Sequence, residues 1–188
     1  MIKQYRLVHN ENLCIGCQAC NVACRVEHSV PDEVYRLQVH VKTHGIFPNL
    51  GMSFERMACV MCENPSCVSV CPTGASFQTK EGLVQIHEKL CVSCKYCILA
   101  CAYHARFVNP ITNTVEKCTF CYETRLSQEL PPACVSVCPT EALSFGDKSH
   151  PNAAFQELLR LEVHLFPKEH LGTKPRVSII PRKKGVKA

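Results

Sequence analysis

Cys67-Val68-Ser69-Val70-Cys71-Pro72-Thr73 recurs without change as Cys134-Val135-Ser136-Val137-Cys138-Pro139-Thr140. Each copy is followed by a short stretch typical of a β-strand, at 75–77 and at 142–145. An identical block with the same continuation indicates a duplicated unit. The block also contains two cysteines of a regular series along the chain. The repeat is therefore expected to form part of a binding site as well as a structural unit.

The chain of 188 residues contains 16 cysteines, which fall into four groups of four. The groups are Cys14, Cys17, Cys20, Cys24; Cys59, Cys62, Cys67, Cys71; Cys91, Cys94, Cys97, Cys101; and Cys118, Cys121, Cys134, Cys138. A cubane iron–sulfur cluster takes four Cys thiolates, and C-x2-C-x2-C-x3-C is typical of bacterial two-cluster ferredoxins. Two groups have this spacing, and the other two have a loop before the third cysteine. Four complete groups predict four [4Fe–4S] clusters.

Disulfides and zinc are the other common uses of cysteine. Dense cysteine in a short secreted chain predicts disulfides, but residues 1–7 lack the apolar segment of a secretory signal. Zinc sites are commonly built from two C-x2-C pairs across a longer gap. A third cysteine three residues after Cys17 and Cys94, and then a fourth, exceeds what such a pair needs. The spacing therefore favours iron–sulfur clusters.

The segments ahead of the first and third cysteine groups resemble each other. Residues 5–14 and 82–91 each read as an alternating strand, a polar turn and the first cysteine of a group. Residues 79–82 supply the turn of a hairpin between the strand after the second group and the strand before the third. Residues 59–101 therefore predict one complete two-cluster ferredoxin unit.

The same logic gives the first and fourth groups a common module. The strand before Cys14 should pair with the strand after Cys138, so that the unit at 59–101 is inserted into an outer module. The predicted fold class is α+β, with two nested bacterial two-[4Fe–4S] ferredoxin-like modules and loop-rich insertions. A simple tandem, in which the first group pairs with the second and the third with the fourth, is the alternative.

The expected domain limits follow from the nested order. They are 1–24 plus 102–150 for the outer module, 52–101 for the inner module, 25–51 for an inserted strand and loop, and 151–188 for a C-terminal docking extension and basic tail. Within the insertion, apolar and polar residues alternate at 35–41, which predicts a strand. A loop with Gly45, Pro48 and Gly51 is expected to follow. Residues 152–163 have apolar side chains at helical spacing and predict a covering helix, and residues 175–180 predict an edge strand.

The formal charge of +5 treats every cysteine as neutral. Sixteen thiolates add about −16 and four cubane cores return about +8, which leaves a net charge of about −3. The basic residues are then largely counter-charge for clusters, so nucleic-acid binding is not indicated. The basic run at 181–187 reads as a solvated tail. No run approaches the roughly 18 apolar residues of a membrane helix, and we expect a soluble chain made in the cytoplasm.

Other site candidates are weak. The sequence contains neither a phosphate-binding glycine motif nor a Ser/His/Asp arrangement, so we expect no nucleotide site and no catalytic residue. The nine histidines show no paired ligand spacing and are expected in loops or at the surface. Lys95, Arg25 and Arg125 could raise the potential of a nearby cluster, but surface placement is the simpler expectation.

Motifs around the cysteines complete a resemblance to a known family. They are Cys59–Cys67 (CVMCENPSC) continuing to Ala75, Lys117–Cys121 (KCTFC), Phe145–Asp147 with Pro151 and Asn152, and Leu171–Pro175 (LGTKP). Together they resemble the iron–sulfur subunits of molybdopterin oxidoreductases of the dimethyl sulfoxide, polysulfide and thiosulfate reductase type. The resemblance covers residues 1–180 and is specific for the subunit type, but it is weak for the substrate.

Carried over by position, the resemblance implies a ligand set for each cluster. Cluster 1 would be held by Cys14, Cys17, Cys20 and Cys138; cluster 2 by Cys24, Cys118, Cys121 and Cys134; cluster 3 by Cys59, Cys62, Cys67 and Cys101; cluster 4 by Cys71, Cys91, Cys94 and Cys97. In each set the fourth cysteine comes from a different group, as in two-cluster ferredoxins. These sets agree with the nesting inferred from the strands.

The resemblance also implies partners. A catalytic subunit with a molybdenum or tungsten bis-pterin cofactor would face the outer module, and an integral-membrane, quinol-oxidising anchor would face the inner module. Subunits of this type are often exported folded with a partner, which implies association with the periplasmic face of the membrane; the cytoplasmic face is the alternative. This interpretation predicts exposed apolar surface on two faces.

Two other functions compete with this interpretation. A cytoplasmic polyferredoxin relay of a hydrogenase or formate dehydrogenase complex would use the same clusters, but the extension at 145–175 favours a docked subunit. A zinc-structured interaction or nucleic-acid module would be colourless and contain no iron.

Overall fold

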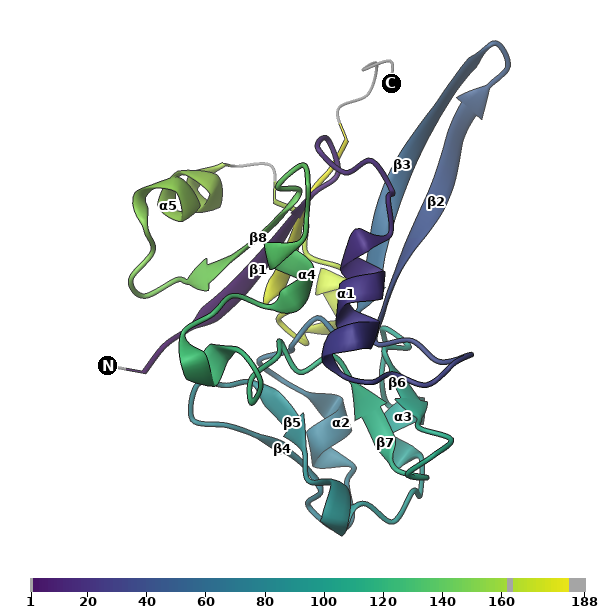
Figure 1. The fold of residues 1–188 in the computed structure, drawn as a ribbon, viewed down its shortest axis with the longest axis vertical. Coiled ribbons are helices and arrows are strands. Elements are labelled where there is room, and N and C mark those ends of the chain that lie inside the picture. The colour runs from purple at the N-terminus through teal and green to yellow at the C-terminus, as the bar shows by residue number, and fades with distance from the viewer. Residues whose placement is uncertain (1, 162–163, 183–188) are drawn as a thin grey trace.

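The strands next to the first and fourth cysteine groups form one sheet. In the computed structural model, which describes residues 2–161 and 164–182, β1 (Tyr5–Asn10) pairs antiparallel with β8 (Leu143–Asp147). The other edge of β1 pairs in parallel with β9 (Val177–Ile180), which gives the order β8-β1-β9 (Figure 1). The predicted pairing of the strands that flank Cys14 and Cys138 is therefore confirmed, and so is the C-terminal edge strand.

Two short hairpins lie at the opposite end of the molecule (Figure 1). β4 (Ser76–Gln78) pairs with β5 (Val84–Ile86) across the predicted turn, in which the Gly82 N–H donates to the Thr79 carbonyl at 2.9 Å. β6 (Arg106–Val108) pairs with β7 (Val115–Lys117). The hairpin expected inside residues 59–101 is thus present.

Four short helices carry the third cysteine of each group. They are α1 (Ala19–Glu27), α2 (Ser66–Ser69), α3 (Tyr96–Leu99) and α4 (Ala133–Ser136). α1 packs against α4, and α2 packs against α3. Single 3₁₀ turns complete the helical structure at η1 (Glu88–Leu90), η2 (Leu126–Gln128) and η3 (Glu169–Leu171). Among the described residues, no helix has both the length and the apolar character needed to cross a membrane.

A long hairpin projects from the body between α1 and α2 in the chain (Figure 1). β2 (Leu37–Ile46) pairs with β3 (Asn49–Ala58) along their whole length, so only Phe47 and Pro48 connect them. The expected loop around Gly45, Pro48 and Gly51 is therefore wrong in extent, because both glycines lie in paired strands. The expected limit at 51/52 falls inside β3.

The position of Gly45, just before the hairpin turn, can be occupied only by glycine. Gly45 has a φ of 88°, and a Cβ at this position would lie 2.1 Å from the Asn49 carbonyl oxygen. The backbones of the two strands approach each other so closely here that no side chain fits. The sequence pattern assigns Gly45 to a loop, but the paired strands of the hairpin require a glycine there.

The cysteines share the core with ordinary apolar side chains. Leu7, Met61 and Phe120 are almost fully buried in the main cluster, which also contains Cys24, Cys118 and Cys134. The interior is therefore built around the predicted metal sites.

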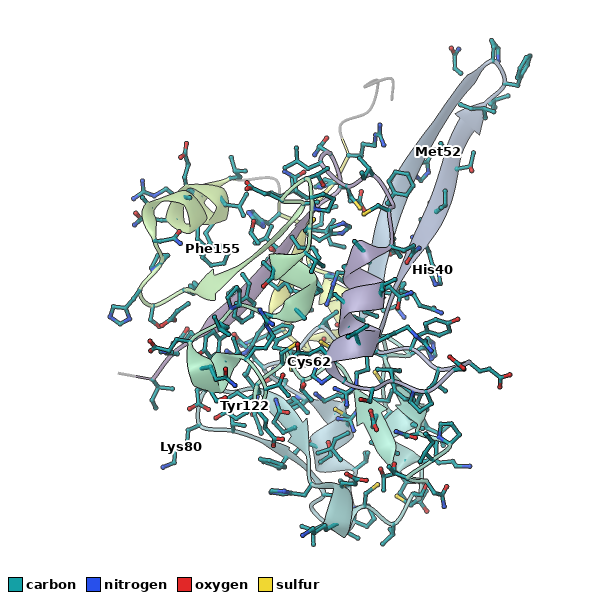
Figure 2. All side chains as sticks on the ribbon, in the orientation of Figure 1. His40, Met52, Cys62, Lys80, Tyr122 and Phe155 are labelled. Carbon is teal, nitrogen blue, oxygen red and sulfur yellow. The ribbon has the colours of Figure 1, made fainter. Side chains whose placement is uncertain are left out.

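α5 (Ala153–Arg160) covers one side of the β8-β1-β9 sheet. The Asn152 side chain caps its first turn by accepting from the Phe155 N–H at 2.8 Å. The buried Phe155 ring packs with Val8 and Ile180, and it touches the sheet where Gly146 leaves room (Figure 2). The covering helix is confirmed as far as Arg160; residues 162–163 and the basic tail at 183–187 lie outside the described residues.

We expect Phe155→Ala to release α5 without disturbing the cysteine groups. Removing a buried phenylalanine ring costs about 3–5 kcal/mol of local stability. Amide hydrogen exchange across α5 should therefore accelerate by at least tenfold in the iron-loaded protein, while the iron content stays unchanged. Gln156→Ala, an exposed change in the same helix, is the control. Equal protection in F155A and the control would show that this contact does not hold the helix.

Candidate iron–sulfur centres

All four cysteine groups share one backbone feature ahead of their second cysteine. The residue before the second cysteine has positive φ in each: 68° at Gly16, 50° at Met61, 53° at Ser93 and 57° at Phe120. Only glycine adopts this region freely, so three of the four residues are held in an uncommon conformation. Turns of this kind direct successive backbone N–H groups into one concavity that suits an anion, as in many Fe–S sites. The shared turn indicates that the four groups serve one kind of ligand.

The first predicted ligand set lies around one small cavity. Cys14, Cys17, Cys20 and Cys138 all line it. The first three come from the loop after β1 and the start of α1, and Cys138 follows α4. The β1–β8 pairing and the α1–α4 packing bring these distant segments together.

The fourth predicted set has the same arrangement at the other end of the molecule. Cys71, Cys91, Cys94 and Cys97 line a second cavity beside the β4–β5 hairpin. The Cys71 thiol is the one whose pKa is lowered: partial burial would raise it, but hydrogen bonds from Ser76 and Thr73 outweigh that effect. The Ser76 backbone N–H donates to Cys71 Sγ at 3.3 Å.

The second predicted set is the most deeply placed. Cys24, Cys118, Cys121 and Cys134 are all buried. Burial raises the pKa of Cys24 above its ordinary range, and negative charge on the other three would raise it further. The four thiols are thus close enough to repel one another as thiolates.

The third predicted set lies in the middle of the molecule, where Figure 2 labels Cys62. Burial raises the pKa of Cys62 to about 12, and negative charge on Cys59, Cys67 and Cys101 contributes to the increase. These four side chains therefore share one region, as the family pattern implies.

Buried thiols favour metal binding only if their charge is balanced. Burial is the largest cause that raises the pKa of Cys20 to about 11 and that of Cys121 to about 12. The metal ligand is the thiolate, so cluster binding has to release these protons. When bound, each cluster would supply an iron–sulfur core that accepts or gives up one electron.

Three buried cations lie among the cysteines. Arg56, Arg106 and Lys117 are 9%, 6% and 1% exposed. Among the described residues, Arg56 Nε and Arg106 Nη1 have no hydrogen-bond partner. A buried, positively charged group with an unpaired N–H donor reduces the stability of the fold unless an anion lies next to it. Four thiolates around a core of about +2 make such an anion, so the residues present fit a [4Fe–4S] cluster.

None of these three cations was a candidate from the sequence pattern. Of the basic residues considered there, Lys95 is exposed, and Arg25 and Arg125 are half-buried. Arg25 donates to the Val34 and Pro31 carbonyls, and Arg125 to the Pro131 carbonyl. Arg56 and Lys117 each lie at a buried position of a strand that leads into a cysteine group. A basic residue at such a position in the sequence would indicate a cation near a cluster.

One histidine departs from the expected loop or surface position, and a second lies against a cysteine. His9 is 2% exposed in β1 and lines the cavity of Cys14, so the expectation is wrong for this residue. Burial, assisted by Arg56, lowers the pKa of His9 to about 4. His28 is half-buried, and its Nε2 lies 3.2 Å from Cys121 Sγ. Burial likewise lowers the pKa of His28 to about 4.

The alternatives of zinc and disulfides gain no support from the geometry. All sixteen cysteines are free. Within residues 2–161 and 164–182, no group of three or more His, Cys, Asp or Glu side chains is arranged to hold a metal ion. Two of the four cysteine sets, those that contain Cys14 and Cys71, each line a cavity of their own.

Two family models match the chain. Both are described as a 4Fe-4S dicluster domain, and they match residues 50–148 and 13–75. The first range contains the second, third and fourth cysteine groups, and the other contains the first and second groups. Because the ranges overlap, the matches do not distinguish nested from tandem pairing.

The chain is similar to curated proteins over nearly all of its length. It is 52% identical to the B subunit of polysulfide reductase from Wolinella succinogenes, with 98% of each protein covered. It is 46% identical to protein NrfC from Escherichia coli K12, over 97% of this chain and 82% of that protein. The electron transfer subunit PhsB of thiosulfate reductase from Salmonella typhi is 48% identical, over 78% of this chain and 77% of that subunit. These matches show that the chain belongs to the family of iron–sulfur subunits of the polysulfide and thiosulfate reductase type, built from 4Fe-4S dicluster domains.

Proposed function

We propose that this chain relays electrons through four [4Fe–4S] clusters between a quinol-oxidising membrane anchor and a molybdopterin catalytic subunit. The complex would be an anaerobic respiratory reductase for a sulfur compound or an S- or N-oxide. The observation that carries the proposal is that thiols of each proposed set lie near one another, and that the residue before the second cysteine of every group has positive φ. The chain contributes no catalytic residue in this proposal, and its task is to hold and space the clusters.

The ligand sets are part of the proposal. Cluster 1 takes Cys138 with the first three cysteines of the chain, and cluster 2 takes Cys24 with the first three of the fourth group. Cluster 3 takes Cys101 with the first three of the second group, and cluster 4 takes Cys71 with the first three of the third. Each fourth ligand thereby links two clusters, which keeps them close enough for electron transfer.

Nested pairing is the module order that we propose. The β1–β8 ladder and the α1–α4 contact join the segments of the first and fourth groups. The β4–β5 hairpin and the α2–α3 contact join those of the second and third groups. A tandem order would require the first group to share ligands with the second, and the described contacts give that arrangement no comparable support.

Exposed apolar side chains occur within and next to the first and third cysteine groups in the chain. The first-group patch consists of Leu13, Ile15, Val22 and Val26, and the third-group patch consists of Leu90, Val92, Tyr96 and Leu99; all eight are exposed. Contiguous apolar surface on a water-soluble face marks a site of protein contact. We assign the first-group patch to the catalytic subunit and the third-group patch to the membrane anchor, so that electrons enter at cluster 4 and leave from cluster 1.

The names of the relatives support this role. The B subunit of polysulfide reductase and the thiosulfate reductase electron transfer subunit are each one part of a reductase. By analogy, the complex of this chain would lie at the periplasmic face of the membrane, to which the chain is attached through its partners.

Anaerobic purification of the native complex tests the function as a whole. We expect the chain to co-purify with a large subunit containing molybdenum or tungsten and with an integral-membrane protein. The chain itself should contribute about sixteen iron and sixteen sulfide. Metal analysis and mass spectrometry of the complex measure both. A brown protein that purifies alone, without molybdenum or tungsten, would contradict the proposal.

Paired ligand substitutions distinguish nested from tandem order. Replacing one thiolate ligand changes the electron paramagnetic resonance signal of the cluster that it binds. In the nested order, Cys14→Ala and Cys138→Ala should alter the same signal, because both residues bind cluster 1. Cys71→Ala is the matched control and should alter a different signal. If Cys14→Ala and Cys71→Ala change one common signal, the tandem order holds instead.

Charged substitutions in the two patches test the partner assignment. Val26→Glu should reduce co-purification of the catalytic subunit by more than tenfold and leave the anchor bound, because an unpaired buried carboxylate costs several kcal/mol. Leu99→Glu should have the opposite effect. Both side chains are exposed, so the iron content should not change. Retention of both partners in both variants would show that these patches are not the contact surfaces.

A further inference from the structure

Lys117 is a charged group that the protein interior should exclude. It ends β7, directly before Cys118, and only 1% of its surface is exposed. Its Nζ donates to the carbonyls of Val84 and Cys118, the latter at 2.8 Å, and lies 3.9 Å from Met61 Sδ. An ammonium group has three N–H donors and no acceptor. Three acceptors around Nζ therefore match the charged form.

The anionic neighbours of Lys117 come from two proposed clusters. Burial is the largest influence on the pKa of Lys117 and lowers it overall, while negative charge on Cys59, Cys118 and Cys67 acts in the opposite direction. Cys118 belongs to the set of cluster 2, whereas Cys59 and Cys67 belong to that of cluster 3. Lys117 thus lies in the gap between the outer and inner modules.

Arg56 occupies the corresponding position between clusters 1 and 2. It lines the cavity of the first cysteine group, and it is buried on β3. Burial would lower the pKa of its guanidinium, but negative charge on Cys134, Cys118, Cys20 and Cys24 raises it overall. Cys20 belongs to the set of cluster 1 and the other three to cluster 2. The Nε donor has no partner among the described residues.

Arg106 occupies the gap between clusters 3 and 4. Its Nη2 donates to Cys67 Sγ at 2.9 Å and to Ser76 Oγ at 2.8 Å. The side chain also interacts with Cys97 and lines the cavity of the third cysteine group. Cys67 belongs to the set of cluster 3, and Cys97 belongs to that of cluster 4.

We propose that Arg56, Lys117 and Arg106 form a series of positioning residues, one in each gap of the relay, that raise the reduction potentials of the two clusters on either side. This inference rests on the proposed function and its ligand sets. An electron adds one negative charge to the cluster that accepts it. A fixed cation in a dry interior stabilises that charge with little screening. Because each cation lies between two clusters, it favours the electron on both sides and shifts both potentials in the same direction.

A redox titration of the full chain in its native complex tests the inference. Electron paramagnetic resonance follows the four one-electron reduction steps in Arg56→Gln, Lys117→Met and Arg106→Gln. In each variant, two steps should become at least tenfold less favourable, which is a fall of about 59 mV for one electron. The other two steps should stay in place. Lys80→Met, which removes an exposed lysine that Figure 2 shows at the surface, is the control and should move none.

The overlap between variants gives a pattern that needs no prior assignment of signals. One step should respond to Arg56 only, one to Arg56 and Lys117, one to Lys117 and Arg106, and one to Arg106 only. The charge-retaining variants Arg56→Lys, Lys117→Arg and Arg106→Lys should keep each step within about threefold of its original equilibrium constant. If a neutral variant loses iron, its other neutral form (Arg→Met or Lys→Gln) is titrated in its place.

The possible results separate the inference from the function on which it rests. Four clusters whose potentials do not respond to the neutral variants would overturn the inference and leave the proposed function intact. The same holds if all four steps move together, or if the charge-retaining variants move them as far as the neutral ones do. Fewer than four clusters in the unaltered chain would overturn the proposed function itself.

Discussion

Negative charge in a dry interior is the constraint on which the rest of this structure depends. Each proposed cluster combines four thiolates with a core of about +2, which leaves about −2 to be balanced. The cysteine groups contain positive-φ turns at Gly16, Met61, Ser93 and Phe120, and the cations Arg56, Lys117 and Arg106 are buried among the cysteines. Without clusters, the same thiols and cations would be poorly paired. The fold and its metal content are therefore one thermodynamic unit.

The main strand pairs and the covering helix could be predicted because they depend on local signals. Alternating strands, turn residues and the duplicated block gave the β1–β8 pair, the β4–β5 hairpin, β9 and α5. The long hairpin was underestimated because Gly45 and Gly51 look like loop residues. Gly45 is required because the backbones of the two strands come very close to each other there. This contact depends on the folded structure and cannot be recognised from the order of residues.

The candidate site divides in the same way. Cysteine spacing predicts the three neighbouring ligands of each cubane, whereas the fourth ligand comes from another group and is assigned from the family resemblance. The positive-φ turn common to the four groups could not be predicted from the sequence. Of the four residues that adopt it, one in each group, only Gly16 is a glycine. The buried positions of His9 and Arg56 depend on which face of β1 and β3 meets the cysteines, and strand pairing decides that. A charged residue on the buried face of a strand beside a cysteine group is the signal to look for.

The central claim is that four iron–sulfur clusters occupy the four cysteine sets in a row of two nested pairs. A crystal structure of the native complex with anomalous scattering recorded at the iron absorption edge tests it most directly. The account predicts four compact iron peaks, one inside each set, in the order 1, 2, 3, 4 from the first-group patch to the third-group patch. Fewer iron peaks, or a peak bound jointly by the first and second cysteine groups, would contradict it.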